Sequence, residues 1–81
     1  MIQLIVKGTT EDARAAANNR EIHVDVMRKL NWHQSICEVR DEHEIAVIKW
    51  FMETDERNLH PTDGYPIGTC LHYTFRGDIP Y

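Results

Sequence analysis

Cysteines and long apolar runs are scarce in this sequence. Cys37 and Cys70 are its only cysteines, and no apolar run approaches the roughly 18 residues of a membrane-spanning helix. The apolar stretch at residues 1–6 is too short for the core of a signal peptide. We therefore expect a cytoplasmic protein without a membrane partner, whose two thiols are reduced and structural. A disulfide between the two thiols is the less favoured alternative.

Basic residues are few and scattered. Nine Lys and Arg residues stand against thirteen Asp and Glu residues, which gives a net charge of −4 at pH 7, and the basic residues form no cluster. Nucleic-acid binding needs a basic surface that neutralises phosphates, and RNA-recognition modules add aromatic side chains on their central strands. The sequence thus disfavours direct nucleic-acid binding and favours a protein partner with a basic surface.

Motifs for catalysis, metal binding and phosphate binding are also missing. The five histidines lack the spacing of a helical zinc site or a zinc finger, and Gly8 precedes a helix without any further glycine of a phosphate-binding loop. Cys70 and His72 are expected on one face of a strand, about 7 Å apart, which is too far for direct proton transfer. We therefore predict no catalytic residue, no metal site and no cofactor.

Hydrophobic periodicity is the main positive signal, and it indicates one domain over residues 1–81. The expected strands are residues 2–7, 21–28, 33–40 and 69–75, and the expected helices are residues 10–19 and 41–57. This βαββαβ order predicts an α+β, ferredoxin-like fold: a four-stranded antiparallel sheet in the order 4-1-3-2, with two helices on one face and the other face open. Because helical and strand patterns compete over residues 21–40, an α+β fold with a three-stranded sheet is the alternative.

Polar residues mark the ends of both predicted helices. Thr9 or Thr10 is expected to cap the first helix, and Asn18 and Asn19 are expected to end it in the left-handed conformation. Asp41, with Glu44 three residues later, resembles a capping box for the second helix.

Aromatic residues supply the candidate anchors for a partner. Trp50 falls at the margin of the apolar arc of the second helix, Tyr65 lies in the loop that follows it, and Trp32 lies in the connection between the second and third strands. Exposed Trp and Tyr are typical of interface anchors. The structural alternative is that Trp50 covers the sheet margin and that Tyr65 packs on its own loop.

Acidic residues near these aromatics complete the candidate site. Glu53 and Glu56 are expected on the polar side of the second helix and Asp63 in the following turn. We predict that partner binding involves Trp50, Glu53, Glu56, Asp63 and Tyr65. The alternative for the acidic residues is an ordinary solvated face.

Three segments resemble small open reading frames of bacteriophages and mobile elements. They are Asp12-Ala13-Arg14-Ala15-Ala16-Ala17, Ile48-Lys49-Trp50-Phe51 and Tyr65-Pro66-Ile67-Gly68-Thr69, and the resemblance covers most of the chain. It implies a single-domain, non-catalytic inhibitor of a host enzyme, of which anti-CRISPR and anti-restriction proteins are the familiar examples.

The functional expectation combines these observations. We expect a protein-binding module that is not an enzyme, with an inhibitor of a host nucleic-acid enzyme as its narrower form. The alternative is a small ligand-binding or regulatory domain that forms a homodimer, since self-association adds burial to a domain this small.

Overall fold

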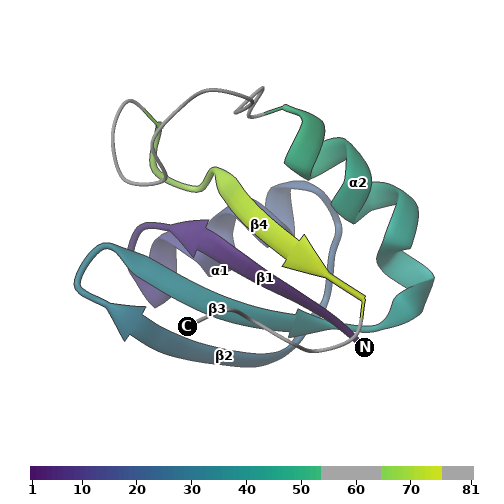
Figure 1. Ribbon diagram of the computed structural model, residues 1–81, viewed down its shortest axis with the longest axis horizontal. Helices are drawn as coiled ribbons and strands as arrows, with labels where there is room; N and C mark the ends of the chain where they lie inside the picture. Colours follow the sequence, from purple (N-terminus) through teal and green to yellow (C-terminus); the bar gives the residue numbers. More distant parts are fainter. Residues whose placement is uncertain (54–64, 76–81) are drawn as a thin grey trace.

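The fold is α+β, with one four-stranded antiparallel sheet and two helices (Figure 1). The computed structural model describes residues 1–53 and 65–75. The elements in chain order are β1 (Ile2–Lys7), α1 (Thr10–Asn19), β2 (Val24–Asn31), β3 (Gln34–Val39), the 3₁₀ turn η1 (Asp41–His43), α2 (Glu44–Met52) and β4 (Cys70–Thr74). The strand order β2-β3-β1-β4 places β1 and β3 at the centre, and the arrangement fits a ferredoxin-like one.

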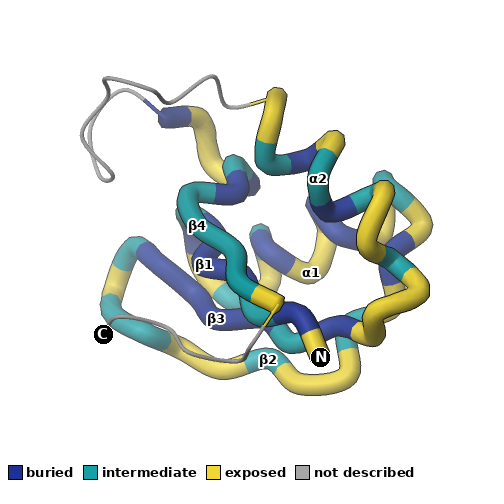
Figure 2. The backbone as a smooth tube through the Cα atoms, turned by 45° about the vertical axis from the view of Figure 1, so that its right-hand side comes forward, coloured by how far each residue is buried: buried dark blue, intermediate teal, exposed yellow. Residues whose placement is uncertain are grey.

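The core lies between the sheet and the two helices. Alternate residues of β1, namely Ile2, Leu4 and Val6, are fully buried against α1 and α2. Ala13, Ala16 and Ala17 form the buried side of α1, and their small side chains let the helix lie close to the sheet. Figure 2 shows the result as a dark band through β1 and β3, whereas no residue of β2 is buried.

The second face of the sheet is not open at its centre, contrary to expectation. Ile5 of β1 and Ile36 of β3 lie opposite each other and are both buried. In the register of the sheet, Ile36 also lies opposite Arg28, and Ile5 opposite His72. Longer polar side chains therefore flank a small apolar centre on this face.

β2 differs from the predicted strand at both ends. The prediction placed it at residues 21–28, with Val24 and Val26 on the same buried face, but a bulge at Asp25 breaks the alternation. Val24 packs on the core, and Val26 is 42% exposed. β2 then continues to Asn31, so the connection to β3 shrinks to a tight turn at residues 32–33.

Of the two predicted helix N-caps, the one for α1 is correct and the one for α2 is wrong. Thr9 caps α1: its hydroxyl accepts the Asp12 backbone N–H, and the Asp12 carboxylate accepts the Thr9 backbone N–H, which completes a capping box. The box predicted for Asp41 and Glu44 is wrong. Residues 41–43 form a 3₁₀ turn, and the Asp41 carboxylate instead lies 2.8 Å from the amino group of Met1.

The predicted C-terminal residues of α1 are also corrected. Glu21, not Asn18 or Asn19, takes the left-handed conformation, with φ of 59°. The Ile22 N–H donates to the Ala17 carbonyl at 2.9 Å and the Glu21 N–H to the Asn18 carbonyl at 3.0 Å. This is a Schellman motif, in which the buried Ile22 side chain fixes the chain path and so decides which residue takes the positive φ.

The second predicted helix and the last strand are both shorter than expected. α2 ends at Met52, and positions 54–57 of the prediction lie outside the described residues. In β4, Cys70 pairs with the core residue Val6, whereas His72 pairs with Ile5 on the other face, because the register shifts between them. Cys70 and His72 therefore do not share a face, contrary to the prediction.

Candidate interaction surface

Trp50 lies in the core. Its side chain is fully buried, its indole Nε1–H donates to the Gly68 carbonyl at 2.9 Å, and the Arg20 guanidinium stands 4.9 Å from the ring centroid. A buried indole needs a hydrogen-bond acceptor, and Gly68 supplies one. The prediction of Trp50 as an exposed anchor is therefore wrong, and its structural alternative is correct.

Tyr65 is buried as well, so the prediction that it forms an exposed anchor is wrong too. Two of the predicted acidic residues, Glu56 and Asp63, lie outside the described residues. Of the five predicted site residues, only Glu53 is exposed in the described part of the chain.

Glu53 forms an ion pair that joins the two helices. Its Oε2 lies 2.5 Å from the Arg20 guanidinium, which also donates to the Ala16 carbonyl at 2.9 Å. Arg20 follows α1 and Glu53 follows α2, so the pair bridges the ends of the two helices. Both side chains are partly exposed, and water and salt screen the attraction between them. Glu53 thus contributes to the tertiary structure.

Two hollows lie on either side of the Arg20–Glu53 ion pair. The first, of about 430 Å³, separates α1 from the loop before β4, and the second, of about 460 Å³, separates the end of α1 from α2. Arg20 and Glu53 line both. Exposed Ile67 lines the first hollow, and exposed Ile45 lines the second. The helix side of the molecule therefore presents recesses with both apolar and charged walls.

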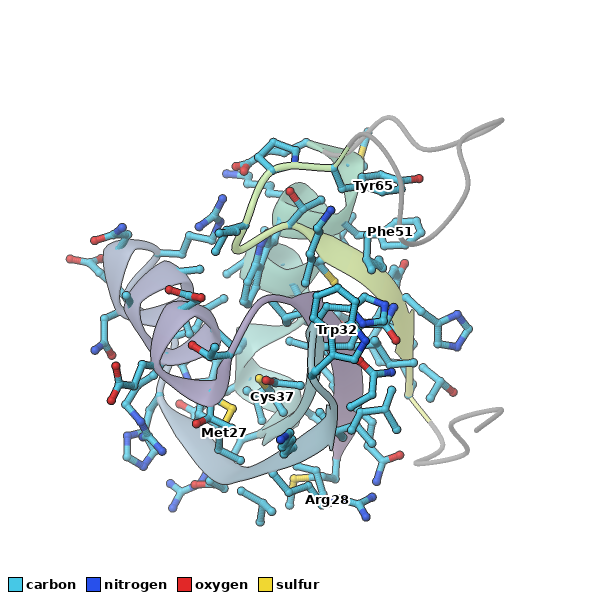
Figure 3. All side chains as sticks on the ribbon, turned by 90° about the vertical axis from the view of Figure 1, so that its left-hand side faces the viewer. Met27, Arg28, Trp32, Cys37, Phe51 and Tyr65 are labelled. Carbon is cyan, nitrogen blue, oxygen red and sulfur yellow. The ribbon has the colours of Figure 1, made fainter. Side chains whose placement is uncertain are left out.

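Trp32 is the most exposed large apolar side chain of the described residues, at 80%. It stands in the tight turn between β2 and β3, and Figure 3, which looks onto this end of the sheet, shows its ring there. The turn is firmly held: the His33 N–H donates to Asn31 Oδ1 at 3.0 Å, and the His33 carbonyl accepts the Gly8 N–H at 2.8 Å. The Trp32 ring also contacts the His33 ring, with centroids 4.3 Å apart.

The outer side of α2 is a second exposed apolar area. Ile45 and Met52 are 71% and 69% exposed, and the exposed Lys49 lies between them in sequence. Neither residue is among the predicted site residues. Their signal in the sequence is the composition of the helix, because α2 is apolar at every position except Glu44 and Lys49.

Acidic side chains gather just before and at the start of α2. Asp41, Glu42 and Glu44 are all exposed. Asp41 is paired with the amino terminus, and Glu42 lies 3.9 Å from Arg40 in a loose, exposed pair. Glu44 occupies the first turn of α2, where the helix dipole favours a negative charge.

The described residues hold no group of three or more His, Cys, Asp or Glu side chains placed to bind a metal ion. Both cysteines are buried in the core. Burial raises the pKa of the Cys37 thiol to about 12, and its Sγ lies 3.4 Å from the Met27 sulfur (Figure 3). A protonated, inaccessible thiol is a poor nucleophile, so Cys37 is a core residue.

Across residues 1–53 and 65–75, no helix has the length and apolar character needed to cross a membrane. A scan against protein-family models and searches of curated proteins and of solved structures found no match.

Proposed function

We propose that this chain is a non-catalytic protein-binding module. The observation that carries the proposal is the exposed Trp32 in a firmly held turn. A tryptophan side chain removes roughly 150–250 Å² of surface from water when it is buried, and Trp is prominent among the residues that dominate interface energies. Because the turn is already held by hydrogen bonds, binding through Trp32 would order little additional backbone.

The proposed partner is a protein with a basic surface. Support comes from the net charge of −4 and from the exposed Glu42 and Glu44 at the start of α2. Such acidic groups increase association rates with a basic surface and make binding sensitive to salt. Charge reversal by Glu44→Lys should weaken binding, and Glu11→Lys is the matched control because Glu11 also stands in the first turn of a helix.

The narrower form of the proposal concerns origin and target. We infer a phage-encoded inhibitor of the anti-restriction or anti-CRISPR type. It would act in the host cytoplasm on a nucleic-acid enzyme of the host. It is supported by the acidic balance and by the segment resemblance described above. We also infer a ferredoxin-like topology, supported by the order β1, α1, β2, β3, α2, β4 and the strand order β2-β3-β1-β4.

The proposal is tested by affinity capture with the immobilised chain, using a bacterial lysate at low and at high salt. We expect one stoichiometric protein that is retained by the wild type, released by salt and lost with Trp32→Ala. Val26→Ala is the control, because Val26 is also exposed and apolar but lies within β2, outside the turn. Capture that is unchanged by Trp32→Ala would contradict the proposal.

A homodimeric domain that binds a small ligand is the second candidate. The hollow of about 430 Å³ beside Arg20 favours it, because ligand sites have volumes of roughly 300–1,000 Å³. A ligand that raises the melting temperature of the wild type but not of Ala15→Trp, which fills the hollow, would support this candidate. A concentration-dependent mass would show the accompanying dimer.

A further inference from the structure

The composition of α2 does not match its surroundings in the structure. Only Glu44 and Lys49 are polar in this helix, and a helix that is apolar on all sides is normally buried on all sides. One side meets this rule, since Val47 and Trp50 are fully buried against the sheet. The opposite side does not, because Ile45 and Met52 are exposed.

The exposed side of α2 has a defined pattern. Ile45 and Met52 are seven residues apart, which places them two turns and roughly 10.5 Å apart on the same side of the helix. Lys49, four residues after Ile45 and three before Met52, lies on that side between them. Lys49 is exposed and forms no ion pair within the described part of the chain.

A second copy of this chain is a poor occupant for that side. Any two-fold pairing of α2 helices centred on Ile45 and Met52 brings the Lys49 residues of the two copies together near the axis. In the antiparallel pairing, Glu44 of each copy also lies opposite Glu53 of the other. These like-charge contacts cost free energy and oppose self-association through α2.

We propose that the outer side of α2 binds a helical segment of another protein, in which two apolar side chains flank a carboxylate. The inference rests on the proposed protein-binding function and adds the chemistry of the partner at this surface. The apolar side chains cover Ile45 and Met52, and the carboxylate pairs with Lys49. Docking removes Lys49 from water, and a buried ammonium without a partner is costly, so Lys49 selects for an acid at that position. The acidic residues Glu42 and Glu53 at the edge of the hollow favour basic residues at the periphery of the same segment.

Two synthetic helical peptides test this proposal. Each carries two leucines two turns apart, with glutamate midway in one and lysine midway in the other, and their dissociation constants are measured by fluorescence anisotropy. For the wild type we expect the glutamate peptide to bind at least about tenfold more tightly, since a like-charge contact costs more than a matched pair. With Lys49→Glu we expect the preference to reverse. Lys29→Glu, a change at an exposed lysine of β2, is the control and should leave the preference intact.

Several outcomes would overturn the proposal. They are equal binding of the two peptides, no binding of either, or a concentration-dependent dimer that Ile45→Ser abolishes, which would make a second copy the occupant. Trp32 is remote from α2 in sequence, and Trp32→Ala is expected to preserve the peptide preference. If the wild type shows no peptide preference but capture still depends on Trp32, only the α2 proposal is refuted. If the wild type shows the preference but capture does not depend on Trp32, the Trp32 basis of the proposed function is refuted.

Discussion

The two tryptophans of this chain occupy opposite environments. Trp50 is fully buried, donates a hydrogen bond to Gly68 and stacks against Arg20. Trp32 is 80% exposed at the end of a hairpin. Within the described residues, the one aromatic ring that its ring contacts is that of its neighbour His33. The same residue type therefore stabilises the fold at one position and is available to a partner at the other.

The difference arises from the elements that carry each tryptophan. Trp50 stands on the side of α2 that packs on the sheet, where Val47 is also fully buried, so its indole lies in the core. Trp32 stands in a two-residue turn between β2 and β3, and no helix or strand of the described residues covers it. Exposure at Trp32 follows from topology, whereas burial at Trp50 depends on which side of α2 faces the sheet.

Replacing Trp50 should have the largest effect on stability. Trp50→Ala removes a fully buried side chain and leaves the Gly68 carbonyl without its donor, so we expect a loss of about 3–5 kcal/mol in the free energy of unfolding. Urea denaturation measures this loss. Trp50→Phe keeps most of the apolar volume and should cost clearly less. A loss below about 1 kcal/mol for Trp50→Ala would contradict the structural role assigned to it.

The burial of Cys37 should make stability depend on pH. The folded state holds the pKa of this thiol at about 12, against an ordinary value of 9.0, so between these values the unfolded chain releases a proton that the folded chain keeps. The stabilisation is complete below pH 9 and is lost as pH rises towards 12, by at most about 1.4 kcal/mol per pH unit. The difference between wild type and Cys37→Ala in urea titrations isolates this contribution from other groups. Identical slopes for the two proteins would argue against a buried, protonated thiol.

A smaller gain is expected at the end of α1. Glu21 has a positive φ, which is unfavourable for a residue with a Cβ, and Glu21→Gly should raise the free energy of unfolding by about 0.5–1 kcal/mol. Asn19→Gly is the matched control, because Asn19 is helical and glycine there should destabilise the protein by a few tenths of a kcal/mol. Thermal unfolding of the two variants should shift in opposite directions, and a shift in the same direction would contradict the Schellman assignment.

Local signals predicted the parts of the fold that local chemistry decides. The alternation of β1, the small side chains of α1 and a threonine cap at Thr9 or Thr10 were all readable because neighbouring residues alone determine them. The bulge at Asp25 was not, because Val24 and Val26 alternate regularly in sequence while the register with β3 decides which of them is buried.

The candidate site was less predictable than the fold, for a physical reason. α2 is apolar around most of its circumference, so its periodicity does not specify which side contacts the sheet. Trp50 was accordingly placed at the margin of the apolar arc, whereas the structure buries it in the core. Trp32 was noted but not chosen, although a tryptophan in a two-residue turn has few ways to be buried.

The smallest effect on stability is expected at Trp32, and it makes the comparison decisive. Trp32→Ala removes little buried surface, so the free energy of unfolding should change by no more than about 0.5 kcal/mol. The same change should weaken binding to the captured partner at least about tenfold, as expected for an interface tryptophan. Urea denaturation and a titration against the isolated partner provide the two measurements. A stability loss approaching that of Trp50→Ala would show that the turn is part of the folded core, and the functional argument from its exposure would fail. A stable variant with reduced affinity would instead separate folding from binding, with one tryptophan responsible for each.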